Sequence, residues 1–185
     1  MPGDYPPARR GLTSRVWVLL GLLLAVACRV PGGDRVPVPV VYVIDGDTVV
    51  VRLAGRNVHV RILGVDTPEI GRNGRPPEPF ARAARRFTER LVRSARRVDL
   101  EIAGDRRDAH GRVLGFLWLH LPGRPSPVNL SEELLRAGLA EAIRFFEYPG
   151  KSRFLALERE ARRAGRGMWA RGGNAPVSEA GGRLE

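Results

Sequence analysis

The sequence predicts a single α+β domain, mainly β, in which five short strands close into a small barrel accompanied by three helices. Apolar residues first alternate at a period of two, which is typical of strands, and later recur at spacings of three and four, which are typical of helices. The 185 residues and the 43% hydrophobic content suffice for one packed core.

The predicted strands are short and rich in β-branched residues. They are expected at residues 40–44, 48–53, 58–65, 97–104 and 112–121. The segment AGRN, residues 54–57, is a turn between the second and third strands. The first three strands therefore form an antiparallel meander.

Helices are expected at residues 80–95, 129–138 and 151–169. The first places Phe80, Ala84 and Phe87 on one face and a series of arginines on the other, which is the pattern of an amphipathic helix. The second has Asn129 or Ser131 as its N-cap. Five strands interrupted by a helix after the third are typical of the oligonucleotide-binding (OB) barrel.

The N-terminal segment, residues 1–28, has the pattern of an export signal. Residues 16–27 are uninterruptedly apolar and follow a basic stretch, but they are too few for a membrane span of about 20 residues. Cys28 directly follows the small residues at the end of this run, as in bacterial lipoprotein signals, in which that cysteine is lipidated. A plain secretory signal and an uncleaved anchor are the alternatives.

The remaining organisation follows from composition. Residues 29–38 are predicted to be a flexible tether, residues 39–170 the folded domain and residues 171–185 a disordered tail. Under each of these interpretations of the N-terminal segment, the folded domain is expected to leave the cytoplasm. We expect an exported monomer that is extracellular or attached to the cell envelope.

The charge balance indicates a polyanionic partner. Lysine and arginine number 31 against 20 acidic residues, a formal net charge of +11, and Lys151 is the only lysine. A basic excess of this size favours nucleic acid or an anionic membrane face. The single cysteine excludes an intrachain disulfide, and no cysteine and histidine cluster suggests zinc.

Two acids stand at strand ends. Asp47 opens the strand 48–53, and Asp66 closes the strand 58–65. A hairpin turning between residues 56 and 57 would pair them, bringing both carboxylates to one rim of the barrel. Adjacent carboxylates call for a cation or raise one pKa. With Thr67 beside them, these hard oxygen ligands suit Ca²⁺ better than zinc.

Three further residues fit phosphoryl chemistry at this rim. Glu69, held by the rigid step at Pro68, is a natural general base for a metal-associated water. Arg61 and Arg112 would clamp a phosphoryl group as its negative charge grows. In the expected register Asp47 and Arg61 point to opposite faces, so a bulge or a strong twist is needed to bring them together.

Five sequence blocks carry a family resemblance: VIDGDTVVV, VRILGVDTPE, DAHGRVLGFLWL, EELLRAGLAEA and EREARRAGRGMW. In order and spacing the chain resembles the staphylococcal nuclease-like, or thermonuclease, family over residues 39–170. The resemblance implies a five-stranded OB barrel with three helices. It also implies Ca²⁺-dependent hydrolysis of DNA and RNA that leaves 3′-phosphate ends.

Matched block to block, the resemblance assigns two sets of site residues. The implied metal ligands are Asp47, Asp66 and, through its backbone carbonyl, Thr67. Glu69 is implied to activate or position the attacking water, and Arg61 and Arg112 are the implied phosphate-binding arginines.

The chain departs from the family's best-known member at the base-binding positions. His110 stands where that protein has a tyrosine, and the segment Arg144-Phe145-Phe146 lies near the place of further tyrosines. Phe145 or Phe146 can still stack on a base. His59 is interpreted as solvated surface and His110 as a turn residue.

Two rival functions remain at this stage. The first is a non-catalytic OB-fold module on the cell envelope that binds nucleic acid through charge and aromatic side chains. The second is a basic envelope lipoprotein that binds lipid headgroups or cell-wall phosphate, and its support is Cys28 and the net charge. The presence of both acids, the base and both arginines favours the enzyme.

Overall fold

The computed structural model describes residues 34–71 and 74–170. The predicted export segment 1–28, with Cys28, the first part of the predicted tether and the predicted tail 171–185 lie outside these residues. Within the described part of the chain, no helix is both long enough and apolar enough to cross a membrane.

The main sheet contains seven of the strands found in the described residues. They are β1 (Arg35–Pro37), β2 (Val40–Asp45), β3 (Thr48–Leu53), β4 (Arg56–Ile62), β6 (Arg97–Arg107), β7 (Val113–His120) and β8 (Val128–Asn129). Their order is β1-β6-β7-β4-β3-β2, with β8 beside β7. The β4–β7 pair is parallel and the others are antiparallel.

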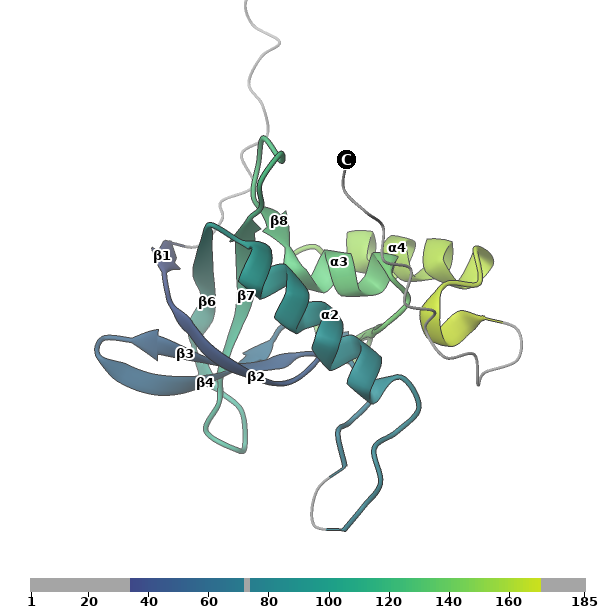
Figure 1. The fold of residues 1–185 in the computed structure, drawn as a ribbon, viewed down its shortest axis with the longest axis horizontal. Helices are drawn as coiled ribbons and strands as arrows, with labels where there is room; N and C mark the ends of the chain where they lie inside the picture. The colour runs from purple at the N-terminus through teal and green to yellow at the C-terminus, as the bar shows by residue number, and fades with distance from the viewer. Residues whose placement is uncertain (1–33, 72–73, 171–185) are drawn as a thin grey trace, which may run out of the picture. The chain divides into compact units, whose positions relative to one another are not determined.

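The two ends of this order are consecutive in the chain, because only Val38 and Pro39 separate β1 from β2. The Val38 amide donates to the Val98 carbonyl of β6 (2.9 Å), and the Arg52 amide of β3 donates to the Pro39 carbonyl (2.8 Å). One bent segment thus joins both edges of the curled sheet (Figure 1). The predicted OB-type fold is confirmed.

Strand β1 corrects one predicted boundary. It lies inside residues 29–38, which were expected to be a flexible tether, and it pairs with β6 through Arg35 and Glu101. The ion pair between these two side chains (3.0 Å) adds to the backbone pairing. The strand was not predicted because the segment is rich in proline and glycine. Its partner β6 also lies far away in the sequence, so no local pattern indicates the pairing.

The hairpin between β3 and β4 turns earlier than expected. Leu53 pairs with Arg56, so the loop consists of Ala54 and Gly55 instead of turning between residues 56 and 57. Both loop residues have positive φ, 46° and 76°, as a two-residue type I′ turn requires. This tight turn matches the right-handed twist of the flanking strands.

The predicted pairing of Asp47 with Asp66 is therefore wrong. Thr48 pairs with Arg61, and the Asp47 carbonyl accepts a hydrogen bond from the Ile62 amide (2.7 Å). Asp66 lies beyond the end of β4, in a separate short strand.

That short strand exists because the chain turns sharply after β4. Gly64 has a φ of 81°, and β5 (Val65–Asp66) follows it. β5 pairs with β9 (Glu141–Ala142) in a second, two-stranded sheet. The single strand predicted for residues 58–65 is thus divided in two.

The three predicted helices are present with shorter ends: α2 (Ala81–Ser94), α3 (Leu130–Arg136) and α4 (Lys151–Arg163). Asn129 caps α3, its side chain accepting from the Ser131 amide at 2.8 Å. A short 3₁₀ helix, η1 (Gly167–Trp169), follows α4. Helices α3 and α4 lie against each other, and α2 packs on β2 (Figure 1).

Helix α2 fixes the turn between β2 and β3. The Thr88 hydroxyl donates to the Gly46 carbonyl (2.7 Å), and both groups are buried. A Cβ atom on Gly46 would lie 2.8 Å from the Cβ atom of Ala84 and 2.8 Å from the Cγ2 atom of Thr67. Gly46 is therefore required by the close approach of the helix.

Gly46→Ala is expected to lower the free energy of unfolding by about 1–3 kcal/mol, because the added methyl group overpacks this contact. Urea denaturation measures the loss. Gly55→Ala is the comparison, since its positive φ costs about 1–2 kcal/mol although no atom lies near its Cβ. Only Gly46→Ala should also impair the site described below, and equal impairment by both variants would contradict this assignment.

Candidate functional site

The site is organised around the carboxylate of Asp47, which is 1% exposed. Its Oδ2 atom accepts hydrogen bonds from the Thr67 amide (2.7 Å) and the Thr67 hydroxyl (2.9 Å). The Thr48 hydroxyl donates to Oδ1 at 3.1 Å. The turn after β2 and the loop after β5 are thereby joined through one side chain.

Arg61 connects the two acids that were expected to hold a metal. Its guanidinium forms ion pairs with Asp47 and, at 2.5 Å, with Asp66. The expected conflict of strand faces does not arise, because Asp47 lies in the turn before β3 and is not bound by strand alternation. Both carboxylates therefore pair with one guanidinium, which is not the arrangement that the predicted register implied.

Arg112 is held beside this cluster by a local turn. Its Nε atom donates to Asp108 Oδ2 (2.6 Å), and its backbone amide donates to Asp108 Oδ1 (2.9 Å). Its Nη1 atom donates to the Thr48 hydroxyl at 3.3 Å. Thr48 thus links Arg112 to Asp47, and both predicted arginines lie at one end of the β3–β4 hairpin.

The pairing with Arg112 also lowers the pKa of Asp108. Burial by itself would raise the pKa of Asp108, but the hydrogen bonds from the backbone and side chain of Arg112, with one from the His110 amide, outweigh it. The pKa of this carboxyl therefore lies below its ordinary value. A carboxylate that stays ionised keeps Arg112 oriented.

Glu69 lies in a cleft of about 760 Å³ next to this cluster. The loop that carries it is closed by two hydrogen bonds, from the Glu69 amide to Glu78 Oε2 (2.9 Å) and from the Glu78 amide to the Glu69 carbonyl (3.0 Å). The cleft is lined by Asp45, His59, Glu69, Ile70, Gly71, Arg75, Pro76, Glu78, His110 and Arg112. The predicted base and one predicted arginine thus face the same space.

The donors around Asp47 are the kind that a hard cation requires. Asp47 and Asp66 offer only oxygen, and one guanidinium between two carboxylates leaves a local charge of about −1 before other groups are counted. The Thr67 amide and hydroxyl both donate to Asp47, so the backbone carbonyl of Thr67 is the group of this residue that could bind an ion. Among residues 34–71 and 74–170, no group of three or more histidine, cysteine or acidic side chains forms a metal-binding cluster.

Several site residues were not singled out from the sequence. Asp45, buried at 2% exposure, and Thr48 belong to the same DGDT block as Asp47, yet only Asp47 was assigned a role. Asp108 could have been found, because an acid that begins a tight turn often accepts hydrogen bonds from amides farther along the turn. His59 and His110 are exposed, as expected, but both line the cleft.

The segment Arg144-Phe145-Phe146, which stands near the place of tyrosines in the family that the sequence resembles, lies outside the cleft. Arg144 pairs with Glu158 at 2.6 Å, and Phe146 packs edge-on against Tyr148 with ring centroids 5.5 Å apart. Phe145 is 86% exposed. None of the three replacement residues lines the cleft.

Comparisons with known proteins show sequence similarity to bacterial nucleases. A family profile described as "Staphylococcal nuclease homologue" matches residues 59–171, a span that begins after Asp47. The chain is 32% identical to "Thermonuclease" of Staphylococcus hyicus over 71% of its own length and 74% of that protein. It is 34% identical to "Thermonuclease" of Staphylococcus intermedius (70% and 73%) and 30% identical to "Micrococcal nuclease" of Shigella flexneri (71% and 72%).

Asp108→Asn is expected to destabilise the protein at neutral pH by about 1–2 kcal/mol, because charged hydrogen bonds to Arg112 are lost. The lowered pKa of Asp108 means that its contribution is present above the ordinary carboxyl pKa and lost as pH falls through the folded-state pKa. The two proteins should therefore converge in acid. Urea unfolding between neutral pH and about pH 3 measures this, and a difference that persists in acid would contradict it.

Proposed function

Because the chain belongs to the staphylococcal nuclease family, we propose that it is a calcium-dependent nuclease that hydrolyses DNA and RNA phosphodiester bonds to 3′-phosphate products. One observation carries the proposal: Arg61 and Arg112 are both linked to Asp47, and Arg112 lines one cleft with Glu69. An arginine and an acid at one cleft, with a second arginine joined to the first through Asp47 and Thr48, suit transfer of a phosphoryl group to water.

The residues that would hold the ion are Asp47, Asp66 and the carbonyl of Thr67. A bound Ca²⁺ would act as a Lewis acid on a phosphoryl oxygen. Arg61 pairs with the same two carboxylates that would hold the ion. The guanidinium and the ion would therefore have to share these carboxylate oxygens. The support is the oxygen-only donor set and its excess negative charge.

The chain's own groups have separate roles in the proposed reaction. Arg61 and Arg112 bind nonbridging phosphoryl oxygens and neutralise the charge that grows during attack. Glu69 accepts a proton from the attacking water. The water oxygen bonds to phosphorus and the bond to the 5′-oxygen breaks. The 5′-oxygen leaves with the bonding electron pair and takes a proton from solvent, so the phosphate stays on the 3′ side. Asp108 keeps Arg112 in place.

We also propose that the nuclease is exported. The support is the basic and then apolar pattern of residues 1–27 and the position of Cys28 after it. A cysteine lipidated at this position would hold the enzyme on the cell envelope, and cleavage without lipidation would release it. Mass spectrometry of Cys28 distinguishes the two forms.

Glu69→Gln is expected to reduce the cleavage rate by about 10²–10⁴-fold, because the amide cannot accept the proton from water. Cleavage of single-stranded DNA, plasmid and RNA is measured with Ca²⁺ and with excess EGTA. Glu133→Gln, at an acid on α3 that is not among the residues lining the cleft, is the matched control and should retain activity. Nucleic-acid binding without cleavage by the wild type in any divalent ion would favour the binding-module alternative.

Asp66→Asn and Asp47→Asn are expected to differ in their effect on stability while both weaken Ca²⁺ binding. The Asp66 side chain is 64% exposed, so its replacement removes a ligand at little structural cost. Asp47 is buried in its hydrogen-bond network, and Asp47→Asn should cost about 1–3 kcal/mol in addition. Calorimetric Ca²⁺ titration and urea unfolding measure the two effects. Unchanged calcium affinity in both variants would remove these residues from the metal site.

A further inference from the structure

The outer surface of β2, β3 and β4 carries two neighbouring rows of side chains. In the first row Thr48 pairs with Arg61. In the second row Val50 pairs with His59 on one side and with Tyr42 on the other. Residues two apart on a strand share a face, so the second row continues the face of Arg61 about 7 Å farther along.

Irregularities in β2 turn Tyr42 to this face. The register shifts between Val40 and Tyr42 and again between Val43 and Asp45. Each shift inserts a residue without a partner, so Val43 still joins the core while Tyr42 lies with His59 on the outside. Asp45, which lines the cleft, lies on the same outer face.

This second row is an exposed aromatic surface. Tyr42 is 51% exposed, and within the described part of the chain its ring makes no aromatic or cation–π contact and its hydroxyl no hydrogen bond. Val50 between the rings is fully buried although it is not part of the core cluster. Two flat side chains beside a covered apolar residue offer a surface for another flat ring.

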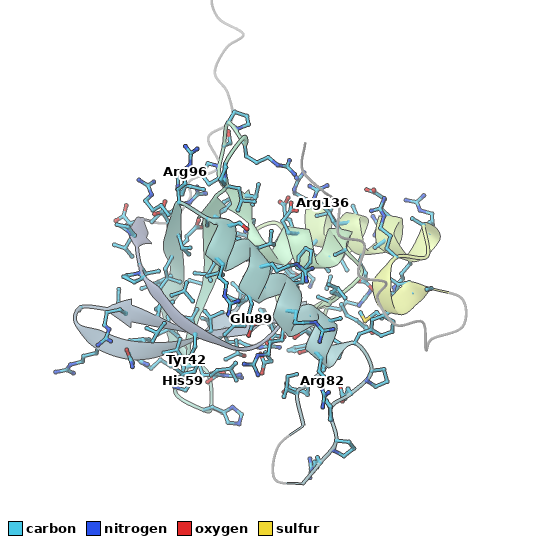
Figure 2. All side chains as sticks on the ribbon, in the orientation of Figure 1. Tyr42, His59, Arg82, Glu89, Arg96 and Arg136 are labelled. Carbon is cyan, nitrogen blue, oxygen red and sulfur yellow. The ribbon has the colours of Figure 1, made fainter. Side chains whose placement is uncertain are left out.

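The row is continuous with the candidate active site. His59 lines the cleft that also contains Glu69 and Arg112. Figure 2 labels Tyr42 and His59 in the same region of the sheet, on β2 and β4, which the register places on either side of β3. The separation of about 7 Å between the rows corresponds to about two base steps of a stacked strand.

We propose that Tyr42 and His59 form a stacking platform for nucleobases that flank the phosphate to be cleaved. The inference rests on the proposed nuclease function and adds a preference for unpaired strands, because a base inside a duplex has no free face to offer these rings. Stacking of this kind tolerates any base sequence. His59 connects the platform to the cleft that it lines, and Tyr42 extends the platform beyond the cleft through the shared pairing with Val50.

The test measures equilibrium binding to the full chain carrying Glu69→Gln, so that the strand is not cut. The probes are a fluorescent single-stranded oligothymidylate, an abasic strand of the same length and a duplex. Tyr42→Ala and His59→Ala should each weaken oligothymidylate binding by about fivefold or more and leave the abasic strand unaffected, because only bases stack. Tyr42→Phe, which keeps the ring, should bind as the parent does.

Phe145→Ala is the matched control, because Phe145 is an exposed aromatic residue that neither lines the cleft nor belongs to the row of Tyr42 and His59. Unchanged affinity in the Tyr42 and His59 variants would overturn the platform, and so would an equal loss with the abasic strand, which would indicate phosphate contacts. A larger loss in Phe145→Ala would also overturn it. Failure of the parent to bind any probe would overturn the proposed function itself, which separates the two failures.

Discussion

The buried carboxylate of Asp47 is the group to which the surrounding structure is fitted. A carboxylate removed from water needs hydrogen bonds and positive charge from the protein. Thr67 supplies two hydrogen bonds, Thr48 supplies one and Arg61 supplies the charge. These partners come from β3, from β4 and from the loop after β5, so satisfying one side chain of the β2–β3 turn brings three segments together.

The same arrangement also restricts which residues can stand at positions that have no part in the proposed reaction. Gly46 must be a glycine because α2 approaches the turn so closely, and Thr88 holds the turn from the helix side. A barrel rim with a helix packed behind it is a rigid support, and reactive groups on a rigid support need little reorganisation. Stability and function are therefore coupled at this rim.

The sequence was most informative where periodicity and local chemistry decide the structure. The main strands and the helices were predicted because each depends on neighbouring residues, and Asn129 was one of the two caps expected for α3. The β3–β4 turn was misplaced because Ala54 adopts a positive φ, which alanine rarely does. β1 was missed because its pairing with β6 is remote. Asp47 and Asp66 were expected together from a register that proved wrong, and in the structure each pairs with Arg61 instead.

The pairing of β1 with β6 has a consequence for how the protein is made. Arg35 pairs with Glu101, and Arg112 joins the site still later in the chain, so the contact order of the essential contacts is high. A nascent chain that ends before Arg112 contains the acids and Arg61 but lacks the second arginine and all of β7. Synthesis must pass this point before the acids, the base and both arginines can be assembled on one folded chain.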